Sequence, residues 1–148
     1  MKISTKGRYG LRALIDLATY ATGNSPVFLS DIAKRQGISE KYLEHIFSSL
    51  NRAGLVKSVR GRKGGYFLGI SAGDITLDTI LNILEGPSIL VDCVTDAAAC
   101  PKTDTCATRD LWKMLGGKIQ ETMKGVTLAN LAEKQKEKAA KDTLMYHI

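Results

Sequence analysis

Residues 29–68, LSDIAKRQGISEKYLEHIFSSLNRAGLVKSVRGRKGGYFL, decide the fold. Ser30 is a suitable N-cap and Gly37 a suitable end for a short helix, because a helix often closes on a left-handed residue. Ser39 then caps a second helix, in which the apolar side chains recur at helical spacing, at Leu43, Ile46, Phe47 and Leu50. Two helices joined by a short turn that contains glycine are typical of a helix-turn-helix.

A basic hairpin follows the two helices. Residues 55–59 are typical of a strand, residues 60–65 (RGRKGG) form a glycine-rich turn, and residues 66–68 predict a returning strand. Helix pairs with a glycine turn also occur in proteins that never bind nucleic acid. The three cations of this turn have no evident packing role, however, and they favour a winged helix that binds duplex DNA.

The charge distribution agrees with a polyanionic partner. Residues 1–66 contain 12 Lys or Arg against 4 Asp or Glu, a net charge of +8, whereas residues 67–148 contain 9 against 11, a net charge of −2. The basic half is therefore the half that contains the winged helix, as expected when phosphate neutralisation supplies much of the affinity.

Candidate DNA contacts fall on three elements. The amino end of a recognition helix usually meets base edges, and lysine at the start of the first helix suits phosphate, helped there by free backbone N–H groups. Glu44 suits a cytosine amino group, although a plain surface glutamate is the alternative. The candidates are Lys6, Ser39, Tyr42, Glu44, His45, Ser48, Arg60 and Arg62.

The remaining chain predicts a mainly α protein with a small two-stranded β wing. Further helices are expected after Ser4 or Thr5, after Thr76, from Thr108 and after Thr127, while the lysine-rich tail is expected to fray. Gly116-Gly117 lies inside the helix from Thr108, which predicts either a local break or the close approach of another backbone.

Several classes of protein are disfavoured by the same sequence. It contains no run of 18 apolar residues, and its first ten residues lack the apolar stretch of a signal peptide, so we expect a cytoplasmic protein with no membrane segment. With two histidines, no phosphate loop and no Ser/His/Asp set, an enzyme is not expected.

All three cysteines lie between residues 88 and 108, with the spacing Cys93-x6-Cys100-x5-Cys106. Their neighbours are Asp, Thr, Lys and Ala rather than core residues, which favours a metal centre or a thiol-based redox switch over buried structural thiols. Three thiolates are one short of the usual four ligands of zinc or an iron–sulfur cluster. The spacing alone does not choose between the two.

With these features, the sequence resembles a bacterial family of iron–sulfur winged-helix transcription regulators, which includes IscR, the nitric-oxide sensor NsrR and the cysteine-metabolism regulator CymR. The resemblance extends to about Glu133 and is carried by four stretches: MKISTKGRYGLRALIDLA (1–18), residues 29–61, GGYFLG (64–69) and the pair Leu111-Trp112 beyond the cysteine loop. CymR-like members lack the cysteine triad, and the overall similarity is closest to IscR.

The resemblance implies a homodimeric repressor or activator that binds a pseudo-palindromic operator. It also implies a cluster held by Cys93, Cys100 and Cys106, with [2Fe–2S] favoured over [4Fe–4S], and control of cluster-biogenesis genes. A nitric-oxide or redox sensor, or a zinc- or thiol-based repressor of the same family, is the alternative. The implied division is a DNA-binding domain at 1–86, a cluster-binding loop at 87–107, and a dimerisation helix with a C-terminal helix and tail at 108–148.

The fourth ligand does not follow from the resemblance. IscR-like members place a histidine three residues after the third cysteine, where this chain has Arg109. NsrR-like members use an aspartate near the start of the first helix, where this chain has Arg8. The candidates that remain are Asp96, Asp104, Asp110, His45 and His147.

Overall fold

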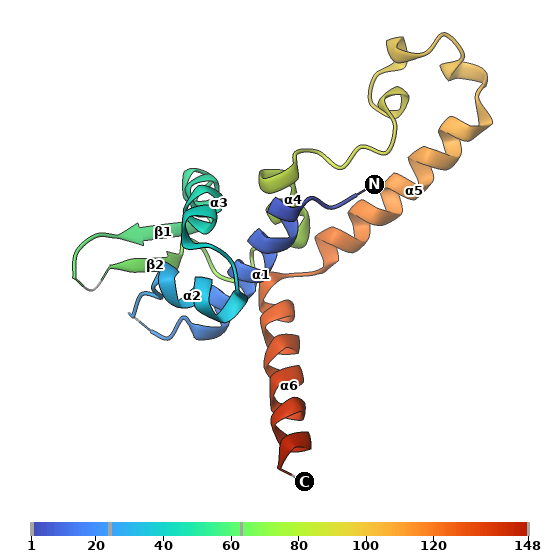
Figure 1. Cartoon of the computed structure of the whole chain (residues 1–148). Coiled ribbons are helices and arrows are strands. Elements are labelled where there is room, and N and C mark those ends of the chain that lie inside the picture. Colours follow the sequence, from blue (N-terminus) through green and yellow to red (C-terminus); the bar gives the residue numbers. More distant parts are fainter. Residues whose placement is uncertain (1, 24, 63, 148) are drawn as a thin grey trace.

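The computed structural model describes residues 2–23, 25–62 and 64–147 (Figure 1). Lys63, one cation of the wing turn, lies outside these residues. In chain order the elements are α1 (Thr5–Tyr20), α2 (Leu29–Gln36), α3 (Glu40–Arg52), β1 (Val56–Val59), β2 (Gly65–Leu68), α4 (Leu77–Glu85), the 3₁₀ turns η1 (Asp92–Val94), η2 (Ala97–Ala99) and η3 (Thr103–Thr105), α5 (Ala107–Gly125) and α6 (Leu128–Tyr146). The expectation of a mainly α fold with one small sheet is confirmed.

The core lies where α1 to α4 meet. Its fully buried side chains come from all four helices, from β1, from the residues just before α4 and from α6; they include Leu14, Ile32, Phe47, Val56, Ile75, Ile80 and Leu128. Apolar burial of this kind is the main favourable term in folding. It fixes α3 on one side of the molecule (Figure 1). The polar residues of α3 stay outside the core, because its buried side chains are Leu43, Ile46, Phe47 and Leu50.

The helix-turn-helix has the expected turn, but its first helix begins earlier than expected. Gly37 adopts a left-handed φ of 64°, and the Ser39 hydroxyl accepts from the Tyr42 N–H at 3.2 Å. Ser30, however, is not the N-cap of α2. Phe28 holds that place without a side-chain cap, because Leu29 is buried and belongs to the first turn.

The wing is an antiparallel hairpin in which Val56 pairs with Leu68 and Val59 with Gly65. Val27, which precedes α2, adds an isolated bridge to the hairpin: its N–H donates to the Tyr66 carbonyl at 3.0 Å and its carbonyl accepts from the Tyr66 N–H at 2.8 Å. The wing is thus tied to the start of the helix-turn-helix as well as to its end.

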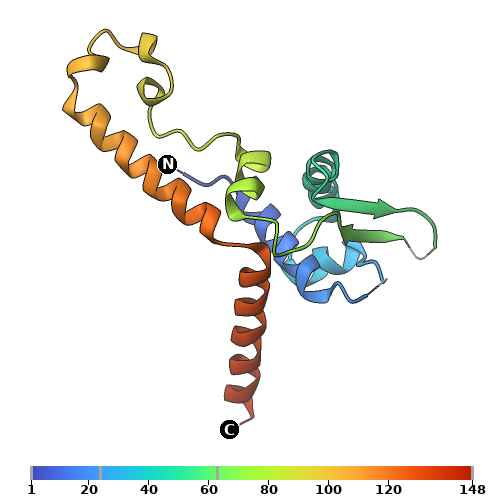
Figure 2. The same ribbon diagram turned by 180° about the vertical axis from the view of Figure 1, so that it is seen from behind.

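Helices α5 and α6 leave the core in different directions from their junction near α1 (Figures 1 and 2). Helix α5 is continuous through Gly116-Gly117, so the expected break is absent, and the nearest group to a Cβ at Gly116 would be the Leu90 side chain at 3.9 Å. The tail does not fray as expected but continues α6 to Tyr146, and the capping box of Thr127 and Asn130 starts that helix. Among the described residues, no helix is long and apolar enough to cross a membrane.

Candidate nucleic-acid interface and cysteine segment

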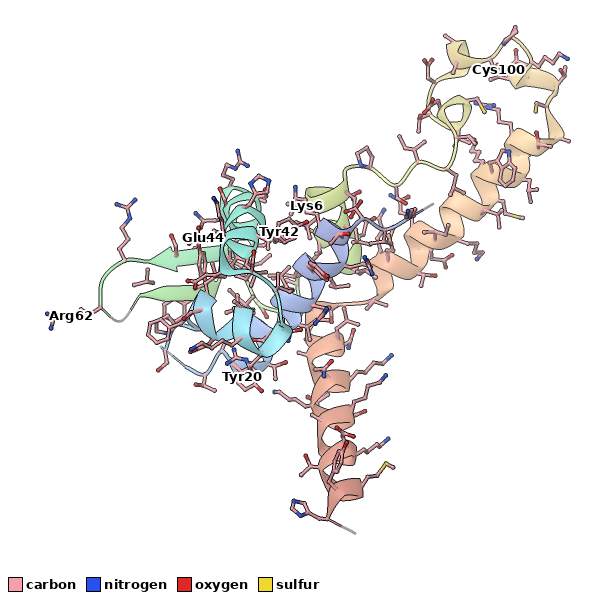
Figure 3. All side chains as sticks on the ribbon, viewed as in Figure 1. Lys6, Tyr20, Tyr42, Glu44, Arg62 and Cys100 are labelled. Carbon is pink, nitrogen blue, oxygen red and sulfur yellow. The ribbon has the colours of Figure 1, made fainter. Side chains whose placement is uncertain are left out.

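Helix α3 carries the expected recognition residues on two of its sides: Figure 3 shows Glu44 on the side of the wing, whereas Tyr42 meets Tyr9 of α1. Glu44, His45 and Ser48 are exposed, Ser39 caps the helix and Tyr42 is half-buried. The wing carries Arg60 and Arg62, both exposed, and Figure 3 shows Arg62 at its far end, pointing away from the core. The fold therefore presents one helix and one basic hairpin on the same side of the molecule.

A cleft of about 320 Å³ separates α3 from the wing, and Glu44, Ser58 and Tyr66 are among the residues that line it. Burial raises the pKa of Tyr66, and the nearby Glu44 carboxylate raises it further. The Glu44 carboxylate therefore interacts electrostatically with the wing. It places a negative charge between α3 and the wing, the two elements that we expect to meet the phosphates and bases of DNA.

The start of α1 differs from the expectation of free N–H groups. The Ser4 hydroxyl accepts from the Gly7 N–H at 3.1 Å, and the Glu85 carboxylate accepts from both the Ser4 N–H, at 3.1 Å, and the Ser4 hydroxyl. A Cβ at position 7 would overlap that carboxylate, so the Glu85 side chain would have to move aside for any residue other than glycine. Lys6 is half-buried on the first turn, close in sequence to the Ser4 N–H that Glu85 accepts from.

Sequence reasoning missed one polar network on α1. Arg12 donates to the Gln36 side chain and carbonyl, and Asp16 accepts from Arg35 and Gln36. One feature of the sequence could have predicted this network. The helical period places Asp16 on the buried face of α1, between Leu14 and Leu17, and a carboxylate there needs a partner. These residues lie between the first helix and the helix-turn-helix.

The cysteines lie on a segment of short turns between α4 and α5. Cys93 lies in η1, Cys100 follows η2 and Cys106 is the N-cap of α5; all three are free and half-buried. A hydrogen bond with the Thr108 hydroxyl at 3.1 Å, followed by one with the Arg109 backbone, lowers the pKa of the Cys106 thiol. The Arg109 guanidinium also donates to the Cys93 carbonyl at 2.8 Å, which ties the first turn to α5.

The donor set suits a thiophilic metal group, because three free thiols share one segment held mainly by 3₁₀ turns. Within residues 2–23, 25–62 and 64–147, however, no three Cys, His, Asp or Glu side chains converge as metal ligands. Asp96 caps η2 by accepting from the Ala98 N–H at 2.9 Å. Ligation by all three thiols therefore requires a rearrangement of residues 93–106.

Comparison with known proteins agrees with this arrangement. Residues 3–134 match the Rrf2 family, described as iron-dependent transcriptional regulators. The HTH-type transcriptional regulator IscR of Vibrio atlanticus is 42% identical over 131 residues, which cover 88% of this chain and 75% of that protein. The HTH-type transcriptional regulator CymR of Bacillus subtilis is 43% identical over 132 residues, which cover 89% and 90%.

Two solved structures have the same fold. CymR, the global cysteine regulator of B. subtilis, superposes with a TM-score of 0.77 at 42% identity, covering 90% of this chain and 98% of that one. IscR of T. potens superposes with a TM-score of 0.73 at 39% identity, covering 93% and 90%. The relatives are named as transcriptional regulators, which confirms a regulator rather than an enzyme. This chain belongs to the Rrf2 family of transcriptional regulators.

Proposed function

We propose that this regulator is of the IscR type and senses iron–sulfur cluster or redox status through Cys93, Cys100 and Cys106. The observation that carries the proposal is the place of the three thiols: all lie on the turns between the end of α4 and the start of α5. The similarity to IscR proteins supports the proposal. The proposed group is [2Fe–2S], and the proposed targets are genes of cluster biogenesis.

The three thiolates would hold the cluster, which would supply a redox-sensitive and labile link among them. The chain itself provides a route from this segment to the DNA-binding part. At one end Glu85 accepts from Ser4 at the start of α1, and at the other Arg109 holds the Cys93 carbonyl against α5. A rearranged segment would therefore act on two helices, and the relative population of two arrangements would set the affinity for DNA.

On DNA, we infer that α3 enters the major groove and that the wing lies along the backbone. Glu44 and Tyr42 would meet base edges, while Lys6, Arg60 and Arg62 would meet phosphates. The regulator would act as a homodimer. Exposed apolar side chains lie along α5, among them Leu111, Trp112 and Leu115. An apolar cleft of about 610 Å³ lies between the same helix, α1 and α4, and Leu11, Leu81 and Ile119 are among the residues that line it. A second copy covering this surface implies a pseudo-palindromic operator.

The test compares wild-type protein with three single variants, Cys93→Ala, Cys100→Ala and Cys106→Ala, all purified without oxygen. We expect iron, acid-labile sulfide and visible absorbance in the wild type only, because no further cysteine exists to replace a lost ligand. We also expect the folded variants to bind at least one duplex operator with altered affinity. Lys102→Ala is the matched control, since it removes an exposed side chain from the same segment without removing a thiol.

A second candidate is a zinc- or thiol-based repressor, because three free thiols on one segment also suit zinc, and a thiol-based switch needs no converged set of ligands. Zinc without iron in the anaerobic protein would support it. Full cluster content in any cysteine variant, or the same DNA affinity with and without the cluster at every operator, would refute the proposed sensor.

A further inference from the structure

Asp16 is a buried carboxylate in the middle of α1. Among the described residues it is the one buried charged or polar side chain, with 4% of its surface exposed. A buried charge is costly unless it is paired and hydrogen-bonded, so its partners must hold it in place. Those partners come from the last turn of α2.

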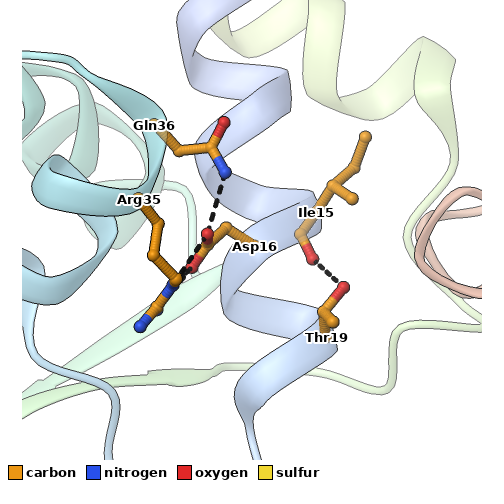
Figure 4. A network of polar contacts seen from close by, with 5 residues as sticks. All are labelled: Ile15, Asp16, Thr19, Arg35 and Gln36. Atoms are coloured by element: carbon orange, nitrogen blue, oxygen red, sulfur yellow. Dashed lines mark hydrogen bonds and ion pairs between the residues drawn. The ribbon is translucent and has the colours of Figure 1, made fainter. Parts of the chain in front are cut away.

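Arg35 and Gln36 donate hydrogen bonds to both oxygens of this carboxylate (Figure 4). The Arg35 Nε donates to Oδ2 at 3.0 Å and Oδ1 at 3.1 Å, and its Nη2 donates to Oδ1 at 2.6 Å. The Gln36 amide donates to Oδ2 at 2.8 Å. The Arg35 guanidinium also lies 3.9 Å from the centre of the Tyr20 ring, so α1 holds it from two sides. The hydrogen bond with Asp16 raises the pKa of Arg35.

The same network reaches the turn between the two helices of the motif. Gln36 is the last residue of α2, and the left-handed Gly37 and Ile38 lead directly to the Ser39 cap of α3. Arg12 donates from Nη2 to the Gln36 carbonyl at 2.7 Å and from Nε to its side-chain oxygen at 3.2 Å. Gln36 is therefore fixed by Asp16 on its amide and by Arg12 on its oxygen and its backbone.

One further contact continues to the recognition helix. The Arg12 guanidinium lies 5.5 Å from the centre of the Tyr9 ring, and Tyr9 meets Tyr42 edge to face, with ring centres 6.1 Å apart. Tyr42 lies in the first turn of α3. A continuous set of polar and aromatic contacts thus joins the buried carboxylate to the end of α3 that would meet base edges.

We propose that Asp16 is a positioning residue for DNA recognition: through Arg35 and Gln36 it fixes the turn before α3 and with it the direction of that helix. The inference rests on the proposed DNA-binding function. Hydrogen bonds to base edges need donors and acceptors placed within a fraction of an ångström, whereas long cationic side chains find phosphates over a wider range. Loss of the network therefore lowers discrimination between sequences much more than it lowers affinity for DNA in general.

A purely stabilising role for the ion pair makes a different prediction, and a paired replacement separates the two. In this pair Asp16 is buried, whereas the Arg35 side chain is 31% exposed. Replacing an ion pair with a buried member by apolar side chains of similar volume is often neutral or stabilising, whereas removing one partner leaves the other without its hydrogen bonds. Asp16→Leu combined with Arg35→Met removes both charges and the clamp on Gln36. If the pair only stabilises the fold, this double variant regains both thermal stability and DNA discrimination.

The experiment uses the full chain and two duplexes: one recovered with wild-type protein from a random pool, and one of the same composition with its sequence scrambled. Asp16→Asn, the double variant and wild type are compared for melting temperature and for dissociation constants on both duplexes at one salt concentration. We expect both variants to lose about tenfold in the ratio of the two constants, the cost of one mismatched base pair, with little change on the scrambled duplex. The double variant should melt closer to wild type than Asp16→Asn.

Glu121→Gln is the matched control, because it removes the exposed ion pair between Lys118 and Glu121 and should leave both readouts unchanged. Wild-type discrimination restored in the double variant would overturn the inference while leaving the proposed function intact. A wild-type protein that discriminates no duplex would overturn both.

Discussion

Glu44 combines exposure with an unfavourable charge for a phosphate-facing helix. It lies on the outer side of α3, beside the cleft that contains Tyr66 and Ser58. A carboxylate so placed lowers affinity for DNA in general, and a good contact with a base amino group offsets that cost at one sequence only. Removing the Glu44 side chain should therefore lower discrimination between DNA sequences without lowering the affinity for DNA in general.

We expect Glu44→Ala to relax discrimination at one base pair by about 1–3 kcal/mol, because the lost contact is specific to that base. Affinity for scrambled duplex should stay the same or increase, since a negative charge is lost. Competition binding against a set of single-base operator variants measures this. Equal changes at every position would make Glu44 an electrostatic bystander.

Arg62 lies at the far end of the wing, where it extends away from the fold (Figure 3). We expect Arg62→Ala to weaken binding to all sequences alike and to reduce the slope of log K against log salt by about one unit, since one phosphate contact is lost. Lys138→Ala, an exposed cation on α6, should leave the slope unchanged. A wild-type slope in the Arg62 variant would remove this residue from the interface.

At the scale of elements, the wing depends on a close backbone crossing. Gly69 follows β2, and its N–H donates to the Leu55 carbonyl at 2.8 Å, which extends the pairing of the hairpin back to the turn after α3. A Cβ at Gly69 would overlap the carbonyl oxygen of Gly54, and backbone cannot move aside as a flexible side chain can. The wing therefore keeps its place only with glycine at this position.

We expect Gly69→Ala to lower the free energy of unfolding by about 1–3 kcal/mol, the usual cost of overpacking. Gly73→Ala serves as its control, because the nearest atom to a Cβ there is the Ser71 hydroxyl at 3.8 Å; it should be neutral or stabilising by less than about 1 kcal/mol. Urea denaturation of the two variants and wild type gives both values. Equal stability of the two variants would contradict the close crossing.

For the whole molecule, one open apolar surface lies along α5. Leu111, Trp112 and Leu115 are 37–42% exposed on a helix that extends away from the core, and a second exposed apolar group lies at the far end of α6, at Leu144, Met145 and Tyr146. Apolar surface gathered on one helix is expected to be covered by a partner. The proposed dimer places that partner on α5.

We expect Leu115→Asp to convert the dimer into a monomer at micromolar concentration, because a charge in an apolar interface is strongly unfavourable. Leu144→Asp is the matched control: Leu144 is 65% exposed, but it lies near the far end of α6. Sedimentation velocity distinguishes the two species. A wild-type monomer would contradict the proposed dimer, and an unchanged dimer in the Leu115 variant would place the contact elsewhere.

Local sequence signals determined much of this protein. Ser4, Ser39, Thr76 and Thr127 cap helices as expected, because a cap needs only a side-chain oxygen beside the next few backbone N–H groups. The basic hairpin follows equally from neighbouring residues. The spacing of the three cysteines was likewise readable, since all three occur within one short segment.

Tertiary structure alone decided which distant groups meet. Asp16 and Arg35 are 19 residues apart and Ser4 and Glu85 are 81 apart, so no local pattern pairs them. The start of α2 at Leu29 instead of after Ser30 has the same origin, because burial of Leu29 outweighs a serine cap. The hydrogen bonds of a helix cap form between residues within one turn of the chain. A buried charge needs an ion-pair or hydrogen-bond partner, and a packed helix end needs apolar contacts, and both come from residues that are distant in the sequence.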